Sequence, residues 1–210
     1  MKLQVYKTVK KENNDEFIEK KSRFIGYVKP VKTSQEALEF IGNIKNIHKD
    51  ATHNVYAYII KDEGVLRYSD DGEPSGTAGV PVLDVLQKSE ITDVAVVVTR
   101  YFGGTLLGAG GLVRAYSHGA KIAIESGIIV TMSVGKRVKI YTDYNTIGKV
   151  LYELGQRGLE QENSEYTDEI VLTITVPIDD VESLENKITE ISSGKSKVEV
   201  VAEVYYQKVE

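Results

Sequence analysis

The sequence predicts an α+β protein of two domains, and three observations support this prediction. At 210 residues the chain has the length of one or two domains. Segments with helical and strand periodicity follow one another without an internal repeat. The charge also changes along the chain, because residues 1–134 carry a net charge of +1 and residues 135–210 one of −6. We therefore expect an N-terminal domain over residues 1–134 and a C-terminal domain over residues 135–210.

The N-terminal domain is expected to mix strands with three helices. Asn13-Asn14-Asp15 reads as the turn between the first two strands, since these residue types favour turns. Pro81 suits the first turn of a helix, and Gly127 suits a helix end. The strands are expected at residues 3–12, 17–29, 53–60, 65–69, 93–99 and 128–134. The helices are expected from Thr33 or Ser34 to Ile47, from Pro81 to Leu86, and from Leu112 to Ile124.

Beyond Gly135-Lys136 the periodicity becomes regular. Apolar residues alternate along the strands, and they recur at three- and four-residue steps along the helices. The strands are expected near residues 138–144, 160–166, 170–176 and 198–204, and the helices at residues 147–154 and 181–191. This β-α-β-β-α-β order is that of a ferredoxin-like domain.

Most of the unusual local chemistry lies between Tyr68 and Glu125. An acidic turn comes first and a glycine loop follows an apolar strand. The turn contains Asp70, Asp71, Gly72, Glu73, Pro74, Ser75 and Gly76. The loop contains Gly103, Gly104, Gly108, Gly110 and Gly111, with Arg100 and Tyr101 before it and Arg114 after it. Five glycines in nine residues indicate a shaped loop, because glycine allows positive φ angles and close backbone approach.

The glycine loop has two interpretations. A helix N-terminus with unpaired N–H groups attracts anions, and Arg100 and Arg114 would add positive charge, so the loop suits contact with phosphate. Alternatively, the glycines only let strand, loop and helix pack closely. The P-loop spacing holds from Gly103 to Gly108, but Ala109-Gly110 stands where a P-loop needs Lys and Ser or Thr.

The acidic turn also has two interpretations. Its carboxylates could hold a divalent cation, since hard cations prefer oxygen ligands. Aspartates in turns more often bond to the local backbone and cap helices. We therefore expect no bound metal, no cofactor and no catalytic residue, and His53 reads as a structural histidine.

Composition narrows the class of protein. The chain has no cysteine, which excludes disulfides and thiolate catalysis. The N-terminal segment has no apolar core of a signal peptide, and no stretch reaches about 18 uninterrupted apolar residues. We expect a cytoplasmic protein with no membrane contact. The first 32 residues carry a net charge of +5, which favours a local basic face.

Several segments resemble the YigZ/IMPACT family. They are SDDGEPSGTAG (69–79), VVVTRYFGGTLLGAGGLVRAYS (96–117), KSRFIG (21–26) and HNVYAY (53–58). The resemblance implies an N-terminal domain similar to the second domain of ribosomal protein S5. It also implies a ferredoxin-like second domain, similar to domain V of elongation factor G. Eukaryotic members act in translational control by binding a protein partner, and bacterial members resemble RNA or ribosome binders.

The sequence thus favours a non-enzymatic protein that binds RNA or the ribosome and acts in translation regulation or stress response. The alternatives are a nucleotide-dependent enzyme similar to small-molecule kinases, with a Mg²⁺ at the acidic turn, and a protein-interaction module. The oligomeric state stays open. The residues expected to contact nucleic acid or a partner are Lys21, Arg23, Arg100, Tyr101, Gly103, Gly104, Gly108, Gly110, Gly111 and Arg114.

Overall fold

The computed structural model describes residues 4–208. The chain forms two compact units, one from Tyr6 to Thr131 and one from Met132 onward that also includes Gln4 and Val5. Each unit contains helices and strands, so the protein is a mixed α and β protein of two domains.

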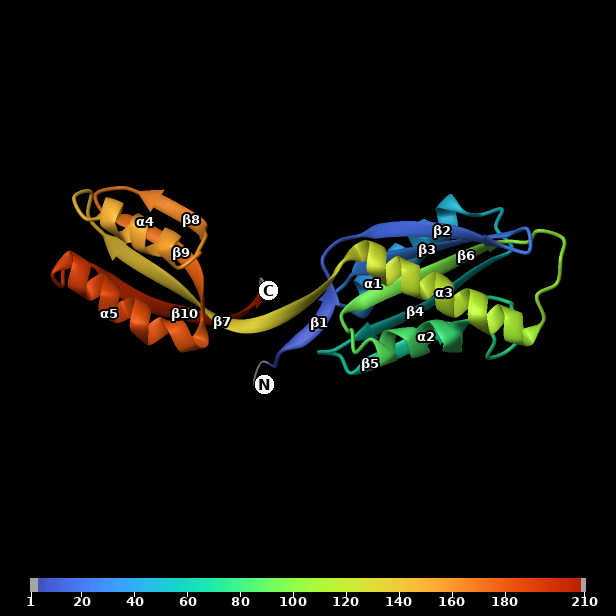
Figure 1. Ribbon diagram of the computed structural model, residues 1–210. Coiled ribbons are helices and arrows are strands. Elements are labelled where there is room, and N and C mark those ends of the chain that lie inside the picture. The colour runs from blue at the N-terminus through green and yellow to red at the C-terminus, as the bar shows by residue number, and fades with distance from the viewer. Residues whose placement is uncertain (1–3, 209–210) are drawn as a thin grey trace. The chain divides into compact units, whose positions relative to one another are not determined.

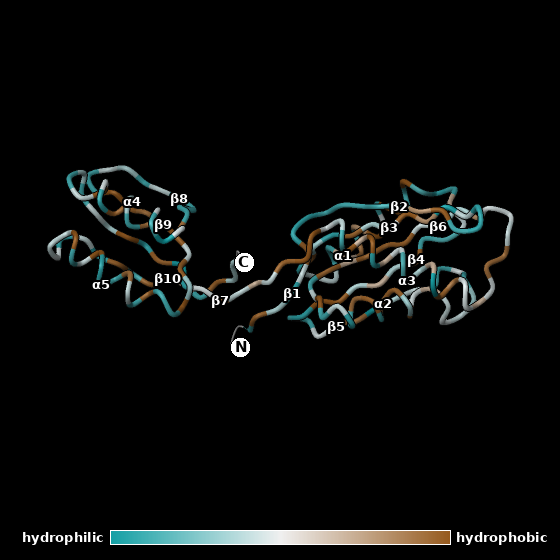
Figure 2. Tube along the Cα trace, viewed as in Figure 1, coloured by the Kyte–Doolittle hydropathy of each residue, from teal (hydrophilic) through white to brown (hydrophobic). Residues whose placement is uncertain are grey.

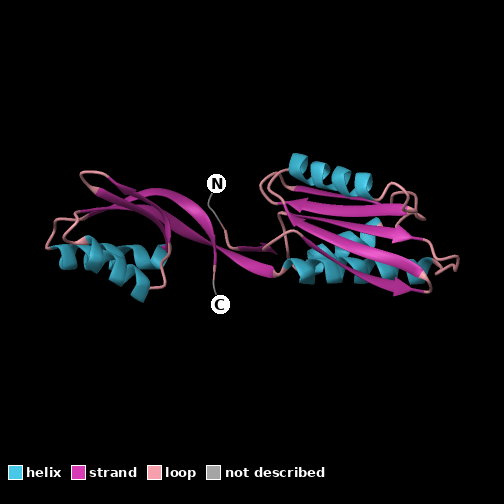
Figure 3. Ribbon diagram, turned by 90° about the horizontal axis from the view of Figure 1, so that it is seen from above, coloured by secondary structure: helices cyan, strands magenta, loops and turns pink. Residues whose placement is uncertain are grey.

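The first domain is built on a five-stranded antiparallel sheet with the order β2-β3-β6-β4-β5. Helix α1 covers one face of this sheet, and α2 and α3 cover the other (Figure 3). The strands are β1 (Tyr6–Val9), β2 (Asn13–Glu19), β3 (Ser22–Pro30), β4 (His53–Ile60), β5 (Val65–Ser69) and β6 (Val94–Tyr101). The helices are α1 (Ser34–Ile47), α2 (Gly79–Lys88) and α3 (Ala109–Gly127).

Strand β6 lies at the centre of the sheet and joins two hydrophobic cores. Val96 and Val98 pack with α2 and α3, whereas Ala95 and Val97 pack with α1. Successive side chains of a strand point to opposite faces, so a strand covered on both faces is apolar at every position. The apolar run at residues 93–99 was expected to be such a strand, and β6 confirms it.

The expected turn at Asn13-Asn14-Asp15 is wrong. These residues begin β2, and the chain turns at Lys20-Lys21 instead, between the paired residues Glu19 and Ser22. The register places Phe17 opposite Phe24, and the two rings stack with centroids 5.1 Å apart. Burial of this aromatic pair against α3 outweighs the local turn preference of asparagine.

The second domain has one four-stranded layer in the order β10-β7-β9-β8, and all of its pairings are antiparallel. Helices α4 and α5 bury one face of this layer on a core that includes Val138, Ile140, Leu172 and Ile174. The strands are β7 (Ile129–Thr142), β8 (Gln161–Tyr166), β9 (Ile170–Pro177) and β10 (Lys197–Gln207). The helices are α4 (Ile147–Gln156), the short 3₁₀ helix η1 (Ile178–Asp180) and α5 (Val181–Ser192).

The strands expected at residues 128–134 and 138–144 are one continuous strand, β7. The expected break between them at Gly135 is wrong. Gly135 lies inside β7 opposite Pro177, and a Cβ atom there would come 2.8 Å from the carbonyl oxygen of Val176. The glycine therefore permits close packing and does not end the strand.

Candidate functional site

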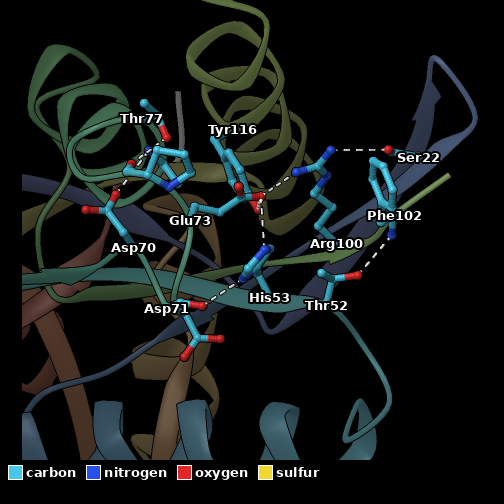
Figure 4. Close-up of polar contacts among 12 residues, drawn as sticks. Ser22, Thr52, His53, Asp70, Asp71, Glu73, Thr77, Arg100, Phe102 and Tyr116 are labelled. Carbon is cyan, nitrogen blue, oxygen red and sulfur yellow. Dashed lines mark hydrogen bonds and ion pairs between the residues drawn. The ribbon is translucent and has the colours of Figure 1, made fainter. Parts of the chain in front are cut away.

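The acidic turn and the glycine loop meet through a buried ion pair. A guanidinium nitrogen of Arg100 lies 2.6 Å from Oε1 of Glu73, and the two side chains are only 6% and 4% exposed (Figure 4). The turn follows β5 and the loop follows β6, with β4 between these strands. The pair thus joins segments that the sequence separates by 27 residues.

Two further side chains lie close to the Glu73 carboxylate. The Tyr116 hydroxyl of α3 donates a hydrogen bond to it at 2.8 Å, and Nε2 of His53 lies 3.7 Å away. Burial and the nearby carboxylate raise the pKa of Tyr116 well above its usual value, so the phenol stays a donor. His53 uses Nδ1 to donate to the carbonyl oxygen of Asp71 at 2.8 Å. Since a carbonyl only accepts, Nδ1 carries a proton.

Arg100 was expected to contact phosphate, but its side chain is engaged inside the protein. The residue is 5% exposed, and its guanidinium lies 5.5 Å from the ring centroids of both Phe24 and Phe102. A second guanidinium nitrogen donates to Oγ of Ser22 at 3.4 Å. A charge buried with its own carboxylate is not available to a phosphate at the surface. Arg100 therefore holds the two motifs together.

The other two carboxylates of the acidic turn also serve the fold. Asp70 accepts hydrogen bonds from the backbone N–H groups of Gly76, Ala78 and Gly79, at 2.7–3.1 Å. Asp71 accepts from the backbone N–H of Asn54 at 2.6 Å and pairs with Lys45 at 2.5 Å. The turn is thus shaped by its own side chains, as expected of aspartates before a helix. Within residues 4–208, no three His, Asp or Glu side chains are grouped to bind a metal ion.

The glycine loop lies against the β2–β3 turn, and both are at the same end of the domain (Figure 1). A Cβ atom on Gly103 would fall 2.0 Å from the carbonyl group of Lys21, so only glycine fits there. Gly104 and Gly108 adopt positive φ angles of 79° and 72°, and Gly108 precedes the first residue of α3. The loop is white and brown in Figure 2 because glycines and leucines, rather than charged residues, form it.

The loop, the β2–β3 turn and α3 surround a cavity of about 440 Å³. Arg114, one of the expected contact residues, lines it and is exposed. Seven of its nine lining residues were not among the expected contact residues, because nothing local links β2 to α3. These are Phe17, Ile18, Glu19, Lys20, Leu107, Ala115 and His118.

The two remaining expected contact residues lie next to this region and have partners within the protein. Arg23 pairs with Glu16 at 2.5 Å on the surface. The Tyr101 hydroxyl lies 2.8 Å from Nδ1 of His48, whose Nε2 lies 2.6 Å from the Tyr27 hydroxyl. Tyr101 is therefore tied to a tyrosine–histidine cluster at the end of β6.

The His48 cluster predicts a pH dependence of stability. Partial burial lowers the pKa of His48 below its usual 6.5, and the nearby Arg23 charge acts in the same direction. The unfolded chain therefore binds a proton at His48 more readily than the folded chain does. The contribution of neutral His48 to the free energy of unfolding is complete above about pH 6.5, and it is lost as the pH falls through the lower pKa of His48 in the folded protein. We expect urea unfolding midpoints to fall between about pH 7.5 and 5.5, and to fall less in His48→Gln. An equal pH dependence in both proteins would contradict this role.

The fold and the site together define a two-domain protein of mixed α and β structure, in which two glycine-containing motifs are joined by a buried ion pair. The Impact N-terminal domain matches residues 20–124, and the domain of unknown function DUF1949 matches residues 140–195. The chain belongs to the IMPACT family.

Individual relatives agree with this assignment. The chain is 38% identical to the IMPACT family member YvyE of Bacillus subtilis, over 98% of this chain and 95% of the relative. It is 32% identical to the IMPACT family member YigZ of Escherichia coli, over 88% and 92%. A solved structure, described as a crystal structure of a hypothetical protein, is similar with a TM-score of 0.60 and 29% identity, over 95% of this chain and 98% of the other. Among residues 4–208, no helix is long and apolar enough to span a membrane.

Proposed function

We propose that this protein binds single-stranded RNA, free or in the ribosome, through the surface around the glycine loop, and acts without catalysis in translation regulation or stress response in the cytoplasm. Three cations at one end of the first domain carry this proposal: Lys20 and Lys21 of the β2–β3 turn, and Arg114 of α3. All three are exposed.

These cations lack the partners that neutralise other basic residues nearby. Arg23 pairs with Glu16, and Lys45 pairs with Asp71. Within the part of the chain that the structure describes, no carboxylate lies within ion-pair distance of Lys20, Lys21 or Arg114. Unpaired lysines and arginines attract phosphates and release the counterions of a nucleic acid. The uncharged loop beside them lets a backbone approach closely.

The local geometry of the β2–β3 turn supports a role for its two lysines. Lys20 and Lys21 have φ angles of 44° and 68° in a two-residue hairpin loop. Asn-Gly or Asp-Gly is usual in such a loop, because left-handed backbone costs about 1–2 kcal/mol for other residues. A strained position occupied by a poorly suited residue suggests that the residue is kept for function. Here that function is positive charge at the tip of the hairpin.

The kinase-like alternative finds little support. It needs a carboxylate of the acidic turn for Mg²⁺, but Asp70, Asp71 and Glu73 are engaged by backbone N–H groups, Lys45 and Arg100. A protein-interaction module uses the same surface without RNA, and the experiment below separates it from RNA binding.

The finer fold assignments belong to the same proposal. We infer that the first domain is similar to the second domain of ribosomal protein S5, and that the second is ferredoxin-like and similar to domain V of elongation factor G. The order β10-β7-β9-β8 with two helices on one face supports the ferredoxin-like assignment. Resemblance to ribosome-associated folds alone does not establish the function.

Replacement of the two turn lysines is expected to separate stability from binding. Lys20→Asn/Lys21→Gly should raise the free energy of unfolding by about 0.5–1 kcal/mol, because Asn-Gly suits the turn. It should weaken RNA binding by roughly 25-fold at about 0.1 M salt, since each phosphate contact contributes a factor of about five under these conditions. Urea unfolding measures the first effect. Fluorescence anisotropy with a labelled single-stranded RNA and co-sedimentation with ribosomes measure the second.

A matched control removes two cations elsewhere in the same domain. Lys88 ends α2 and Lys121 lies in the C-terminal half of α3, and their side chains are 80% and 64% exposed. Each has a carboxylate of its own helix 3.8 Å away, and neither lines the cavity beside the glycine loop. Lys88→Gln/Lys121→Gln should bind RNA as wild type does. Wild-type protein that does not bind RNA or ribosomes at about 50 mM salt would refute the proposal, and capture of a protein partner with no RNA would favour the interaction module.

A further inference from the structure

We propose that the cavity between β2 and α3 binds one nucleotide of a single-stranded RNA, with the base against its apolar wall and a phosphate at Lys20 and Arg114. This inference deepens the proposed function and depends on it. The cavity has a volume of about 440 Å³, within the range of about 300–1,000 Å³ typical of small-molecule sites. Its lining residues are Phe17, Ile18, Glu19, Lys20, Leu107, Gly111, Arg114, Ala115 and His118.

The cavity lining has an apolar part and a charged part. Phe17 and Leu107 supply apolar surface. Lys20 and Arg114 supply two positive charges against the single carboxylate of Glu19. A nucleotide has the same division, with a flat apolar base face and an anionic phosphate. Proteins that bind single strands combine such a basic groove with aromatic surfaces for bases.

The aromatic part of the wall is held in place before any ligand binds. The Phe17 ring stacks on Phe24, whose ring is fully buried, with an interplanar angle of 10°. His118 meets Phe17 edge-on, with ring centroids 4.5 Å apart and an interplanar angle of 68°. The two rings thus form a corner, and the His118 ring is exposed. A preformed aromatic corner lowers the ordering cost of binding a base.

The cationic part is positioned by the backbone. Lys20 stands in the strained β2–β3 turn, and the following residue, Lys21, packs on Gly103 of the glycine loop. Arg114 lies in the first two turns of α3, near Gly110. Lys20 and Arg114 therefore approach the cavity from two different elements, the β2–β3 turn and α3. This arrangement suits a phosphate held between two cations.

The test separates the base contact from the phosphate contact by their salt dependence. The probe is a fluorescein-labelled twelve-nucleotide single-stranded RNA, titrated with full-length protein at several salt concentrations. Arg114→Gln should reduce the magnitude of the slope of log affinity against log salt by about 0.7, the value for one phosphate contact on a single strand. Phe17→Leu and His118→Ala should each weaken binding by about fivefold or more with an unchanged slope, because stacking involves no counterion release.

Competition with small ligands tests whether the cavity recognises a nucleotide unit. Adenosine monophosphate should displace the RNA from wild-type protein at concentrations at which inorganic phosphate does not. Lys88→Gln serves as the charge control and should match wild type, and circular dichroism checks that Phe17→Leu is folded. His118→Ala changes an exposed ring and keeps the test valid if Phe17→Leu fails to fold.

The outcomes distinguish this inference from the proposed function. Wild-type protein that binds RNA while Phe17→Leu and His118→Ala bind equally well would overturn the nucleotide site and leave RNA binding intact. Equal displacement by phosphate and by adenosine monophosphate would also overturn it. Binding of adenosine monophosphate without binding of RNA would overturn the RNA assignment and favour a free nucleotide. Wild-type protein that binds neither would refute both proposals.

Discussion

Arg100→Ala is expected to lower the free energy of unfolding by about 3–5 kcal/mol, the usual cost of leaving one member of a buried ion pair alone. The Glu73 carboxylate is 4% exposed, and without Arg100 it would keep the Tyr116 hydroxyl as its hydrogen-bond donor at 2.8 Å. The loss should appear as a lower midpoint in urea unfolding of the full chain.

Two further variants test the cause of this loss. Arg114→Ala removes the same side-chain type from the surface, and its free energy of unfolding should stay within about 0.5 kcal/mol of wild type. Glu73→Leu/Arg100→Met removes both charges, so it should be more stable than Arg100→Ala. A loss below about 1 kcal/mol for Arg100→Ala would contradict an ion pair excluded from water.

Gly26→Ala is expected to lower the free energy of unfolding by about 1–3 kcal/mol or more through overpacking. Gly26 of β3 lies under α3, and a Cβ atom there would come 2.2 Å from the carbonyl oxygen of Gly119. The added methyl group must push the helix away from the sheet, because the clash is with backbone. Urea unfolding measures the stability, and RNA binding should weaken as well, since α3 forms one wall of the cavity.

Gly42→Ala is the matched control. Gly42 lies in α1, and no heavy atom stands within 4 Å of its added Cβ atom. Alanine favours a helix over glycine by about 0.5–1 kcal/mol, so this variant should be more stable than wild type. Replacement of glycine by alanine is thus expected to lower the free energy of unfolding at Gly26 and to raise it at Gly42. Equal effects at the two positions would show that close packing of α3 on β3 does not limit stability.

The order of helices and strands was largely predictable because periodicity and capping residues are local signals. Thr33, one of the two expected capping residues, caps α1, and the strands His53–Ile60 and Val65–Ser69 lie at the predicted positions. The errors occurred where tertiary contacts outweigh local preference. Gly135 stays inside β7, and Asn13 stays inside β2.

The site was predictable in part. The acidic turn and the glycine loop stand out by composition, but their connection depends on the sheet order, in which β4 lies between β5 and β6. An arginine at a strand end gives no local sign that its partner will be Glu73, so the sequence pattern favoured a ligand contact for Arg100. Lys20 was missed for a similar reason, because lysine is not a usual turn residue.

The β2–β3 turn also predicts how this protein would respond to directed evolution. Lys20 and Lys21 occupy backbone conformations that suit asparagine and glycine better. A screen that rewards heat resistance alone should therefore discard both lysines early and enrich variants that no longer bind RNA. A screen that alternates heating with selection for RNA capture should retain them and improve other positions, such as Gly42. The residues that survive the second screen and are lost in the first would mark the binding surface before the RNA that it recognises is identified.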